Sequence, residues 1–452
     1  MDDRRRSHPR PLAALAVLCV AGTLGGLTPG PAQAAPGGDP RPYRTSGAPI
    51  SGGLTSKDAA PLALGEPRVD SIGQGETRFY AVDLDARSTA YVSAVAVPPP
   101  GARLDARQDG IRVTLTRLDG GRCDTATAGA DADDVPHPFG TAVVRQSGPG
   151  AGSRCGEAGR HLVSVERPDA AESRTERWTL ELRSLREPAI KGEPTGKPAK
   201  GNEGGHAPLP RTGRPQQRAG GTGFNDATAL SPGAWKDTVA PGETRFFKVP
   251  VDWGQQLLTS VEVPAPAGSS GKSTGSAGFL SDALGAALYN PARALLATNH
   301  FVPYKGSQST SRIGTVPVSY VNRTERSRAT VRAASIAGWY YVAVTLSPDM
   351  ERYFEDGAPV TVRVHVAGDA QPTPRYDGGS GGFGTGADER RPGPYQRGAA
   401  DAGDSAPLRA VAYGGFGLGT ALLVGLGAWK LSARRRGTAL AGTGGAGDDA
   451  GW

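Results

Sequence analysis

The sequence predicts an all-β protein that contains two tandem antiparallel β-sandwiches with a jelly-roll-like order of strands. Short apolar runs alternate with polar residues at a period of two, which is typical of half-buried strands. A hexapeptide at residues 75–80 returns at 242–247, about one domain length later. The 66 Gly and 38 Pro among 452 residues indicate two cores joined by unstructured segments, because so many chain breakers do not fit one compact body.

The repeated hexapeptide belongs to a longer collinear match. Residues 75–80 read Gly-Glu-Thr-Arg-Phe-Tyr and residues 242–247 read Gly-Glu-Thr-Arg-Phe-Phe. The apolar runs that follow keep their order, and their offset drifts by only a few residues, so we infer a tandem duplication with sandwich architecture. The matched runs are Tyr80, Val82 and Leu84 with Phe247, Val249 and Val251; Val95 and Val97 with Val261 and Val263; 158–163 with 337–342; and Trp178, Leu180 and Leu182 with Val360, Val362 and Val364.

Composition along the chain predicts eight consecutive parts. Segments rich in Pro and Gly, with little apolar content, are expected to be mobile and to separate the apolar units. The predicted parts are a signal peptide at 1–34, a disordered stretch at 35–53, sandwich one at 54–186, a flexible linker at 187–221, sandwich two at 222–368, a spacer at 369–407, a transmembrane helix at 408–431 and a cytoplasmic tail at 432–452.

Both ends of the chain carry targeting signals. The start is basic, an apolar run covers 12–27, and Ala32-Gln33-Ala34 provides a small-x-small cleavage site. Near the C-terminus, residues 410–429 hold no charge and are long enough to span a bilayer. A basic cluster at 430–436 follows, and positive charge stays in the cytoplasm. We expect a single-pass cell-membrane protein with extracellular N-terminal domains and a cytoplasmic C-terminus.

The net charge of +7 does not indicate nucleic-acid binding. Part of the excess lies in the basic start of the signal peptide and in the basic cluster after residue 429, and what remains is spread over the rest of the chain. Such a dilute charge does not form a phosphate-binding face. We therefore expect no nucleic-acid partner.

Two of the three cysteines are predicted to form a disulfide. Cys19 lies in the apolar stretch of the signal and should leave with it, so Cys123 and Cys155 are the only pair left in an exported segment. The alternative is two separately buried thiols. Neither has a Cys or His at metal-ligand spacing.

The second unit resembles the pre-peptidase C-terminal domain family. Ala229, Leu230 and Gly233 form an Ala-Leu-x-x-Gly entry, Gly-Glu-x-x-x-Phe-x-Val follows, Leu-Tyr-Asn-Pro occupies 288–291, and Ala-Gly-x-Tyr-Tyr-Val closes the unit at 337–342. The resemblance, over the two units, implies small jelly-roll-like sandwiches that accompany secreted bacterial enzymes and surface proteins as accessory modules, with no catalytic residues to transfer. The whole chain is also similar to single-pass envelope proteins of actinobacteria.

Acidic residues between the two cysteines are the candidate metal ligands. Asp131, Asp133 and Asp134 supply hard oxygen atoms of the kind that Ca²⁺ prefers, with Asp124 and His137 nearby. Some members of the family bind calcium in loops, but no acidic pattern is shared by the two units. The alternative is a solvated acidic loop, and we expect no cofactor.

Two further patterns predict contacts. Trp339 and Tyr341 could share the outward face of a strand and stack on sugar rings or on a protein partner. The alternative is packing against the neighbouring sandwich or against the second sheet of their own sandwich. Gly415 and Gly419 place small residues on one face of the predicted transmembrane helix, where they would favour a homodimer. The alternative is compositional noise. Residues 209–213 spell Leu-Pro-Arg-Thr-Gly, but they lie too far from the membrane segment for a sorting signal.

No catalytic motif stands out in the sequence. The chain has no Gly-x-Ser-x-Gly and no His-Glu-x-x-His, and neither His161 nor His365 has a nucleophile at a recognisable spacing. We therefore expect a non-enzymatic, membrane-anchored extracellular protein that binds an envelope protein or a polysaccharide. An accessory or scaffold subunit of another membrane or secreted protein is the first alternative. A hydrolase with an unrecognised site is the second.

Overall fold

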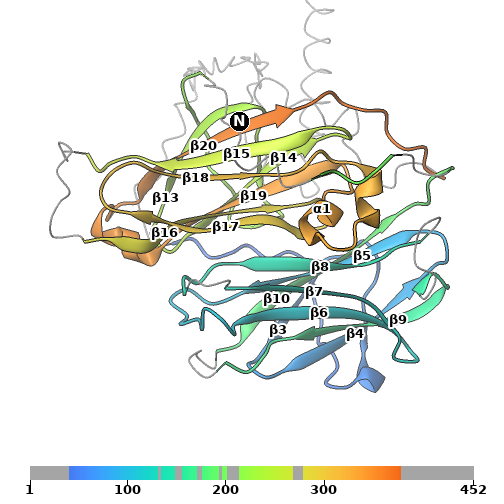
Figure 1. Ribbon diagram of the computed structural model, residues 1–452. Coiled ribbons are helices and arrows are strands. Elements are labelled where there is room, and N and C mark those ends of the chain that lie inside the picture. The colour runs from blue at the N-terminus through green and yellow to red at the C-terminus, as the bar shows by residue number, and fades with distance from the viewer. Residues whose placement is uncertain are drawn as a thin grey trace, which may run out of the picture. The chain divides into compact units, whose positions relative to one another are not determined.

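The structure is a computed structural model that describes residues 40–130, 134–147, 155–170, 176–192, 196–200, 213–267 and 278–377 (Figure 1). The described chain is built almost entirely from antiparallel strands, so the predicted fold class is confirmed. Both sandwiches lie in one compact unit. The predicted signal peptide and transmembrane helix, with Gly415 and Gly419, lie outside the described residues. Within the part that is described, no helix has the length and apolar character to cross a bilayer.

The first sandwich, here called repeat 1, consists of two five-stranded sheets. One sheet has the order β1-β3-β10-β5-β8, and the other has the order β2-β4-β9-β6-β7. The strands of the first sheet are β1 (Ala48–Pro49), β3 (Arg68–Ile72), β10 (Trp178–Glu187), β5 (Thr89–Val97) and β8 (Phe139–Arg145). Those of the second are β2 (Ala60–Pro61), β4 (Thr77–Leu84), β9 (Gly159–Glu166), β6 (Gly110–Arg117) and β7 (Arg122–Gly129).

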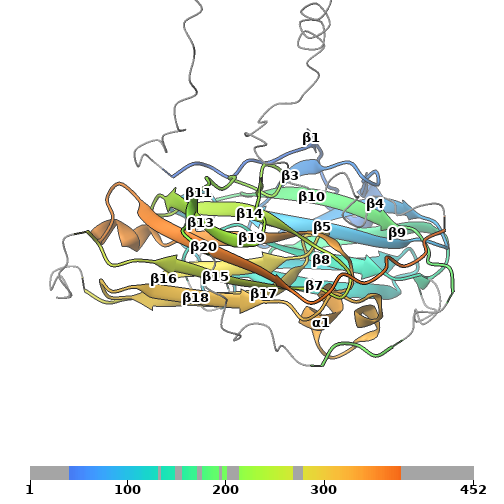
Figure 2. The same cartoon turned by 90° about the horizontal axis from the view of Figure 1, so that it is seen from above.

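The second sandwich, repeat 2, has the same topology with every strand number raised by ten. Its sheets have the orders β11-β13-β20-β15-β18, visible from above in Figure 2, and β12-β14-β19-β16-β17. Its strands are β11 (Gln216–Gln217), β12 (Thr228–Ala229), β13 (Gly233–Val239), β14 (Thr244–Val251), β15 (Gln256–Val263), β16 (Leu280–Tyr289), β17 (Leu295–Tyr304), β18 (Ser309–Gly314), β19 (Gly338–Leu346) and β20 (Ala358–Ala367). This identity of strand order supports a duplication.

Short helices break the symmetry. In the described part of repeat 1, the 3-10 helix η1 (Ser56–Asp58) precedes β2. Repeat 2 inserts η3 (Tyr320–Thr324) and α1 (Ala329–Ala333) between β18 and β19, and η4 (Pro348–Arg352) between β19 and β20. The η3–α1 insertion matters for function, because its residues contact repeat 1.

The repeated hexapeptide forms the turn that enters β4 and β14. Gly75 and Gly242 adopt positive φ values of 68° and 78°, which glycine tolerates without a steric penalty. The next residue folds its carboxylate back onto the turn: Glu76 accepts a hydrogen bond from the Gly73 N–H at 2.9 Å, and Glu243 accepts one from the Ala240 N–H at 3.1 Å. The repeated sequence is therefore a structural turn motif rather than a binding motif.

Each repeat closes around its own apolar core. The inward faces of β4 and β14 carry the predicted residues, and the side chains of Tyr80 and Phe247 are almost fully buried. His161 on β9 occupies the position that Tyr340 takes on β19, since the two pair with Val82 and Val249. Both side chains are buried, so His161 is a packing residue. His365 lies between core-facing neighbours on β20, on the outward face.

The structure corrects the alignment of two matched strand pairs. Asp70 and Asp237 are equivalent residues of the two repeats, because they accept hydrogen bonds from equivalent glycines, Gly52 and Gly220, at 2.7 and 2.8 Å. The residue before each aspartate and its partners on the next two strands form a row across the sheet. This row is Val69, Glu181 and Val95 in repeat 1, and Lys236, Thr361 and Glu262 in repeat 2.

Val95 therefore corresponds to Glu262 rather than to Val261, so the match of β5 with β15 is wrong by one residue. Because successive residues of a strand face opposite sides, a slip of one changes the face. Val261 lies in the core of repeat 2, whereas Val95 faces outward from repeat 1. The match of β10 with β20 is wrong by two residues, because Glu181 corresponds to Thr361, and this slip leaves the faces unchanged.

Parts of three segments predicted to be mobile are placed in the fold. Residues 40–53 contribute β1, and Gly53 forms a bridge with Phe79. Ile190, in the predicted linker, forms a bridge with Tyr376, in the predicted spacer. Composition misses these contacts because short extended segments dock by backbone hydrogen bonds, which need no apolar side chains. The domain boundaries drawn from the sequence otherwise stay a prediction.

The predicted disulfide is confirmed. Cys123 on β7 is bonded to Cys155, just before β9, with their Cα atoms 5.7 Å apart. The bond joins the edge strand of one sheet to the chain that enters its centre. Disulfides persist in oxidising compartments, so the bond agrees with an exported domain.

Candidate functional site

The interface between the repeats is the most distinctive feature of the described structure. The outward face of the β5–β10 sheet in repeat 1 packs on the outward face of the β14–β19–β16 sheet in repeat 2. Aromatic rings supply most of this apolar layer, and Phe224 contacts three of them edge-on or tilted, with centroids 4.9–5.1 Å apart. The buried members are Val95, Phe224, Ala227, Phe246, Tyr289, Tyr341 and Ala343.

Two buried carboxylates on β10 lie within this interface. Glu181 is fully buried and forms an ion pair with Arg293 of repeat 2, which is also buried. Asn225 donates to the same carboxylate at 2.8 Å and accepts from Arg293 at 2.7 Å. A buried ion pair offsets its desolvation only when its remaining hydrogen bonds are made, as they are around this carboxylate.

Glu187 forms the second buried ion pair, six residues further along the same face of β10. Arg323 of η3 donates to both of its carboxylate oxygens, at 3.0 Å each, which is a bidentate geometry. The Tyr91 hydroxyl donates to the same carboxylate at 2.9 Å. The guanidinium of Arg323 also stacks over the Tyr320 ring, 3.2 Å from its centroid. Glu187 thus joins two strands of repeat 1 to the insertion of repeat 2.

The segments at the two ends of the described chain each donate a hydrogen bond to one of these carboxylates. Tyr43 donates its hydroxyl to Glu181 at 3.2 Å, and Tyr376 donates to Glu187 at 2.8 Å. Burial, together with the neighbouring carboxylate, raises the pKa of both tyrosines well above the usual range, which keeps the hydroxyls protonated as donors. We call Glu181, Glu187, Arg293, Arg323, Tyr43 and Tyr376 the interface lock.

Local sequence explains how the two arginines reach β10. After β16, Asn290 accepts hydrogen bonds from the N–H groups of Ala292 and Ala294, both at 2.9 Å, and forms a tight turn. This turn holds Arg293 at φ 61°, a left-handed conformation that is costly for a residue with a side chain. Asn322 fixes η3 in a similar way, by donating to the carbonyls of Pro317 and Ala334.

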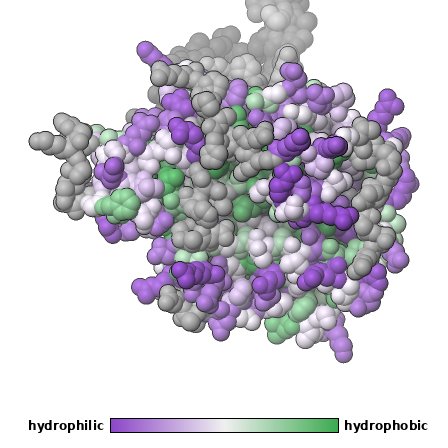
Figure 3. Space-filling view, viewed as in Figure 1, coloured by the Kyte–Doolittle hydropathy of each residue, from purple (hydrophilic) through white to green (hydrophobic). Residues whose placement is uncertain are grey.

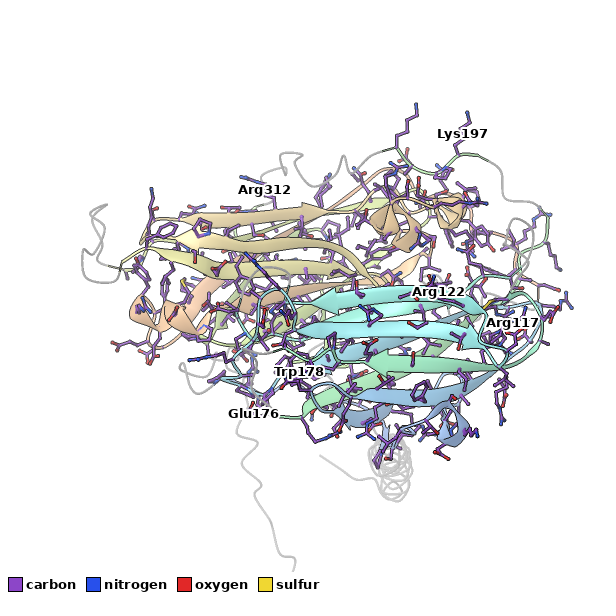
Figure 4. The ribbon with its side chains drawn as sticks, turned by 60° about the horizontal axis from the view of Figure 1, so that its bottom comes forward. Arg117, Arg122, Glu176, Trp178, Lys197 and Arg312 are labelled. Atoms are coloured by element: carbon purple, nitrogen blue, oxygen red, sulfur yellow. A yellow bond between two sulfur atoms is a disulfide. The ribbon has the colours of Figure 1, made fainter. Side chains whose placement is uncertain are left out.

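A polar pocket of about 380 Å³ lies at the edge of the interface, beside the disulfide. Repeat 1 contributes β7, β8 and both half-cystines, and repeat 2 contributes the chain from η3 to α1. We call it the arginine pocket. Its lining consists of Cys123, Asp124, Val144, Arg145, Gln146, Cys155, Arg323, Thr324, Glu325, Arg326 and Arg332. Figure 4 shows the disulfide close to Arg122, which is exposed at the start of β7.

The residues predicted as ligand contacts lie in different environments. Tyr341 is buried in the interface, 8% exposed, against Phe224. Trp339 is half-buried on the same strand, and Lys248 lies over its ring at 5.1 Å from the centroid. Tyr341 therefore packs on the chain itself, and Trp339 stays a predicted contact.

Of the three acidic candidates, only Asp134 is among the described residues. Asp134 is exposed, and Asp131 and Asp133 lie outside the described residues. No group of three or more His, Cys, Asp or Glu side chains that could hold a metal occurs among the residues described. His137 contacts the rings of Phe139 and Phe301 instead.

Comparisons with known proteins identify no family. No protein-family model matches the chain, and no curated protein matches it. The resemblance to the pre-peptidase C-terminal family therefore stays a prediction.

Solved structures that share similarity are distant. The tandem CBM51 modules of a family 98 glycoside hydrolase from Streptococcus pneumoniae SP3-BS71 are 9% identical, with 71% of this chain and 88% of that chain covered and a TM-score of 0.18. The CUB1-EGF-CUB2 domain of human MASP-1/3 is 6% identical, with 66% and 99% covered and a TM-score of 0.16. Tripeptidyl peptidase 2 is 10% identical, with 67% and 24% covered and a TM-score of 0.19, so the match spans about a quarter of that chain. Likenesses this weak carry no argument about function.

Proposed function

We propose that the chain is a non-enzymatic, membrane-anchored protein of the bacterial cell surface, in which two locked sandwiches act as one rigid binding body. The single observation that carries this proposal is the interface lock. Buried ion pairs are not expected between two flexibly joined domains, because the interaction energy of each pair must offset the desolvation of two charges. Their presence indicates that the relative orientation of the repeats matters.

Rigidity has a physical benefit for a binding protein. A ligand that contacts both repeats does not have to order them, so less of the interaction free energy is lost on association. The interface also carries the arginine pocket, which is formed by residues of both repeats. A binding body fixed in this way, held outside the cell by the predicted anchor, would present that pocket to the envelope. The confirmed disulfide supports export.

Surface digestion tests the location. The full-length chain, with an epitope tag at each end of the mature protein, is treated with protease on intact cells. We expect loss of the N-terminal tag and survival of a short C-terminal fragment inside the cell. Full protection of both tags in intact cells, with digestion after lysis, would refute the predicted topology.

Recovery from native membranes tests the binding role. The full-length chain is purified in detergent and its associated molecules are identified by mass spectrometry and by sugar analysis. A co-purifying envelope polymer or surface protein that also binds the re-purified chain supports the proposal. A stoichiometric membrane protein that needs this chain for its own stability supports the accessory-subunit alternative. Turnover of a cell-wall or peptide substrate, abolished by one polar substitution, would overturn both.

A further inference from the structure

We propose that the arginine pocket binds an anionic saccharide unit, a sugar acid or a sugar phosphate, through Arg145, Arg326 and Arg332. This inference deepens the proposed function, because it names the class of ligand that the locked repeats would hold. The shared chemistry is an anionic oxygen group on a small polyhydroxy unit. Arginine suits such a group, since its planar guanidinium can donate two parallel hydrogen bonds to a carboxylate or a phosphate.

Arg145 is the first argument. Its side chain is almost fully buried, with 1% of the residue exposed, yet it forms no ion pair with a described residue. It donates to the backbone carbonyls of Asp85 and Gly156, and its Nε atom has no partner. Burial lowers the pKa of Arg145, which reflects the cost of keeping its charge away from water. The Asp85 carboxylate opposes this effect only in part. A buried charge that forms no ion pair with a described residue is costly, and an anion in the adjoining pocket would offset that cost.

Arg326 and Arg332 are the second argument. No described residue forms an ion pair with either guanidinium, and Arg332 reaches only the carbonyls of Glu325 and Arg326, at 3.4 and 3.5 Å. Figure 3 shows strongly hydrophilic residues gathered over α1, the helix that carries Arg332. The pocket therefore presents two guanidinium groups on the side formed by repeat 2, and one of them, Arg332, interacts electrostatically with Asp124 of repeat 1.

The other charged groups in the lining are already engaged. Arg323 is bound by Glu187, and Glu325 is bound by Arg328 and by the Ser327 hydroxyl, so neither adds a free charge. Asp124 is the remaining acid. Its carboxylate accepts a hydrogen bond from the Val144 N–H at 2.8 Å and attracts the Arg332 guanidinium, while burial raises its pKa.

The size and lining of the pocket fit a sugar rather than an apolar ligand. About 380 Å³ accommodates a single sugar unit, and the lining is mostly polar. Gln146 donates its amide to the Arg323 carbonyl at 2.9 Å, which leaves the amide oxygen to accept from a hydroxyl. The walls come from both repeats, so the complete site exists only while the interface lock is closed.

Titration of the full-length chain in detergent tests the proposal. The probes are glucuronate, glucose 1-phosphate, glucose and sodium sulfate, followed by calorimetry at constant ionic strength. We expect binding of glucuronate or glucose 1-phosphate and none of glucose. The double variant Arg326→Gln, Arg332→Gln should weaken that binding by about tenfold or more, since two charge-assisted contacts are lost. The variant Arg312→Gln, changed at an exposed arginine on β18 (Figure 4), should bind like the wild type.

Each outcome has a defined meaning. Tighter binding of glucuronate identifies the sugar acid, and tighter binding of glucose 1-phosphate identifies the sugar phosphate. Equal binding of glucose, binding of sulfate as tight as that of the sugars, or no effect of the double variant would overturn the proposal. Circular dichroism of the double variant confirms that it is folded. If the double variant still binds the polymer recovered from membranes, the pocket is excluded while the binding role survives.

Discussion

Repeats 1 and 2 share one topology but use the same sheet face differently. In repeat 1, the row across β3, β10 and β5 is mainly apolar and contains a buried carboxylate; in repeat 2, the equivalent row is polar throughout. The row in repeat 1 is Val69, Glu181 and Val95, and the row in repeat 2 is Lys236, Thr361 and Glu262. Among the described residues, only the first of these faces packs against the other repeat through the apolar layer.

This difference shows how a duplicated fold acquires a fixed orientation. Apolar residues on the outer face of repeat 1 provide the surface that is buried between the repeats. Glu181 and Glu187 fix how the two repeats are aligned, because each forms an ion pair with one arginine of repeat 2. The hydrophobic layer is non-directional, whereas a bidentate ion pair accepts one geometry. The predictions below test that division of roles, beginning with the largest effect.

Breaking the Glu187 pair should have the largest effect. Glu187→Gln leaves Arg323 buried without its counter-ion, and we expect a loss of about 3–5 kcal/mol in the free energy of unfolding. Denaturant unfolding of the purified chain measures it. The matched control is Asp349→Asn, which removes a surface pair with both side chains more than half exposed and should change stability by less than about 1 kcal/mol. Equal effects of the two substitutions would show that the lock contributes no more than a surface pair.

The paired variant Glu187→Leu, Arg323→Met separates charge from packing. Because no charge is left unpaired, its loss should be well below that of Glu187→Gln alone. If the double variant is as unstable as the single one, shape rather than charge governs this contact.

Removing the disulfide should weaken repeat 1 selectively. Cys123 and Cys155 are 32 residues apart, and replacing both by Ser should cost about 3–4 kcal/mol in the chain-entropy model. Hydrogen exchange should accelerate in β6 and β7 more than in β16 and β17, which have no such bond in the described chain. Uniform acceleration in both repeats would mean that they unfold as a single cooperative unit.

Removing one tyrosine hydroxyl from the lock should have a smaller effect. Tyr376→Phe deletes one hydrogen bond to Glu187, a change of about 1.5–3 kcal/mol for a charged acceptor. Hydrogen exchange should rise at Lys191, whose N–H donates to Arg375 at 2.6 Å in the adjoining ladder. Tyr353→Phe, which removes a hydroxyl bound to Gly278 within repeat 2, is the control and should leave exchange at Lys191 unchanged.

The two copies of the turn glutamate should respond to acid in opposite directions, with the smallest effect. Hydrogen bonds from Arg177 lower the pKa of Glu76 to about 2, so its stabilisation is present above the unfolded pKa of about 4.5 and disappears as the pH falls toward 2. Burial raises the pKa of Glu243. Glu243 also shares a single buried arginine, Arg245, with a second acid, Asp237. Protonation of Glu243 therefore favours the folded state.

Urea unfolding between pH 2 and 7 measures this contrast. Glu76→Gln should flatten the acid side of the stability profile, whereas Glu243→Gln should make the acid loss steeper, because it removes a group that favours folding when protonated. The two variants would contradict the assignment if they changed the profile in the same direction.

Much of the fold follows from local patterns. Period-two alternation located the core faces of β4, β14, β9 and β19, because a half-buried strand must alternate. The hexapeptide revealed the duplication because it occurs in both repeats. In each repeat its glycine and glutamate form the same turn through local contacts alone. Cys123 and Cys155 could be paired because no other cysteine lies outside the predicted signal peptide. The slip between β5 and β15 arose because Val recurs on both faces of β5, one of which is covered by the other repeat.

The amino-acid sequence by itself therefore determined where the core strands lie along the chain, the duplication and the disulfide, all of which depend on local patterns, on a repeated motif or on residues few in kind. The tertiary structure alone decided which sheet face is covered and which charges meet. Glu187 and Arg323 are 136 residues apart, and nothing local marks either as buried. A charged residue on an outward strand position reads as solvated until a second sheet is placed over it, because burial is a property of the assembled fold.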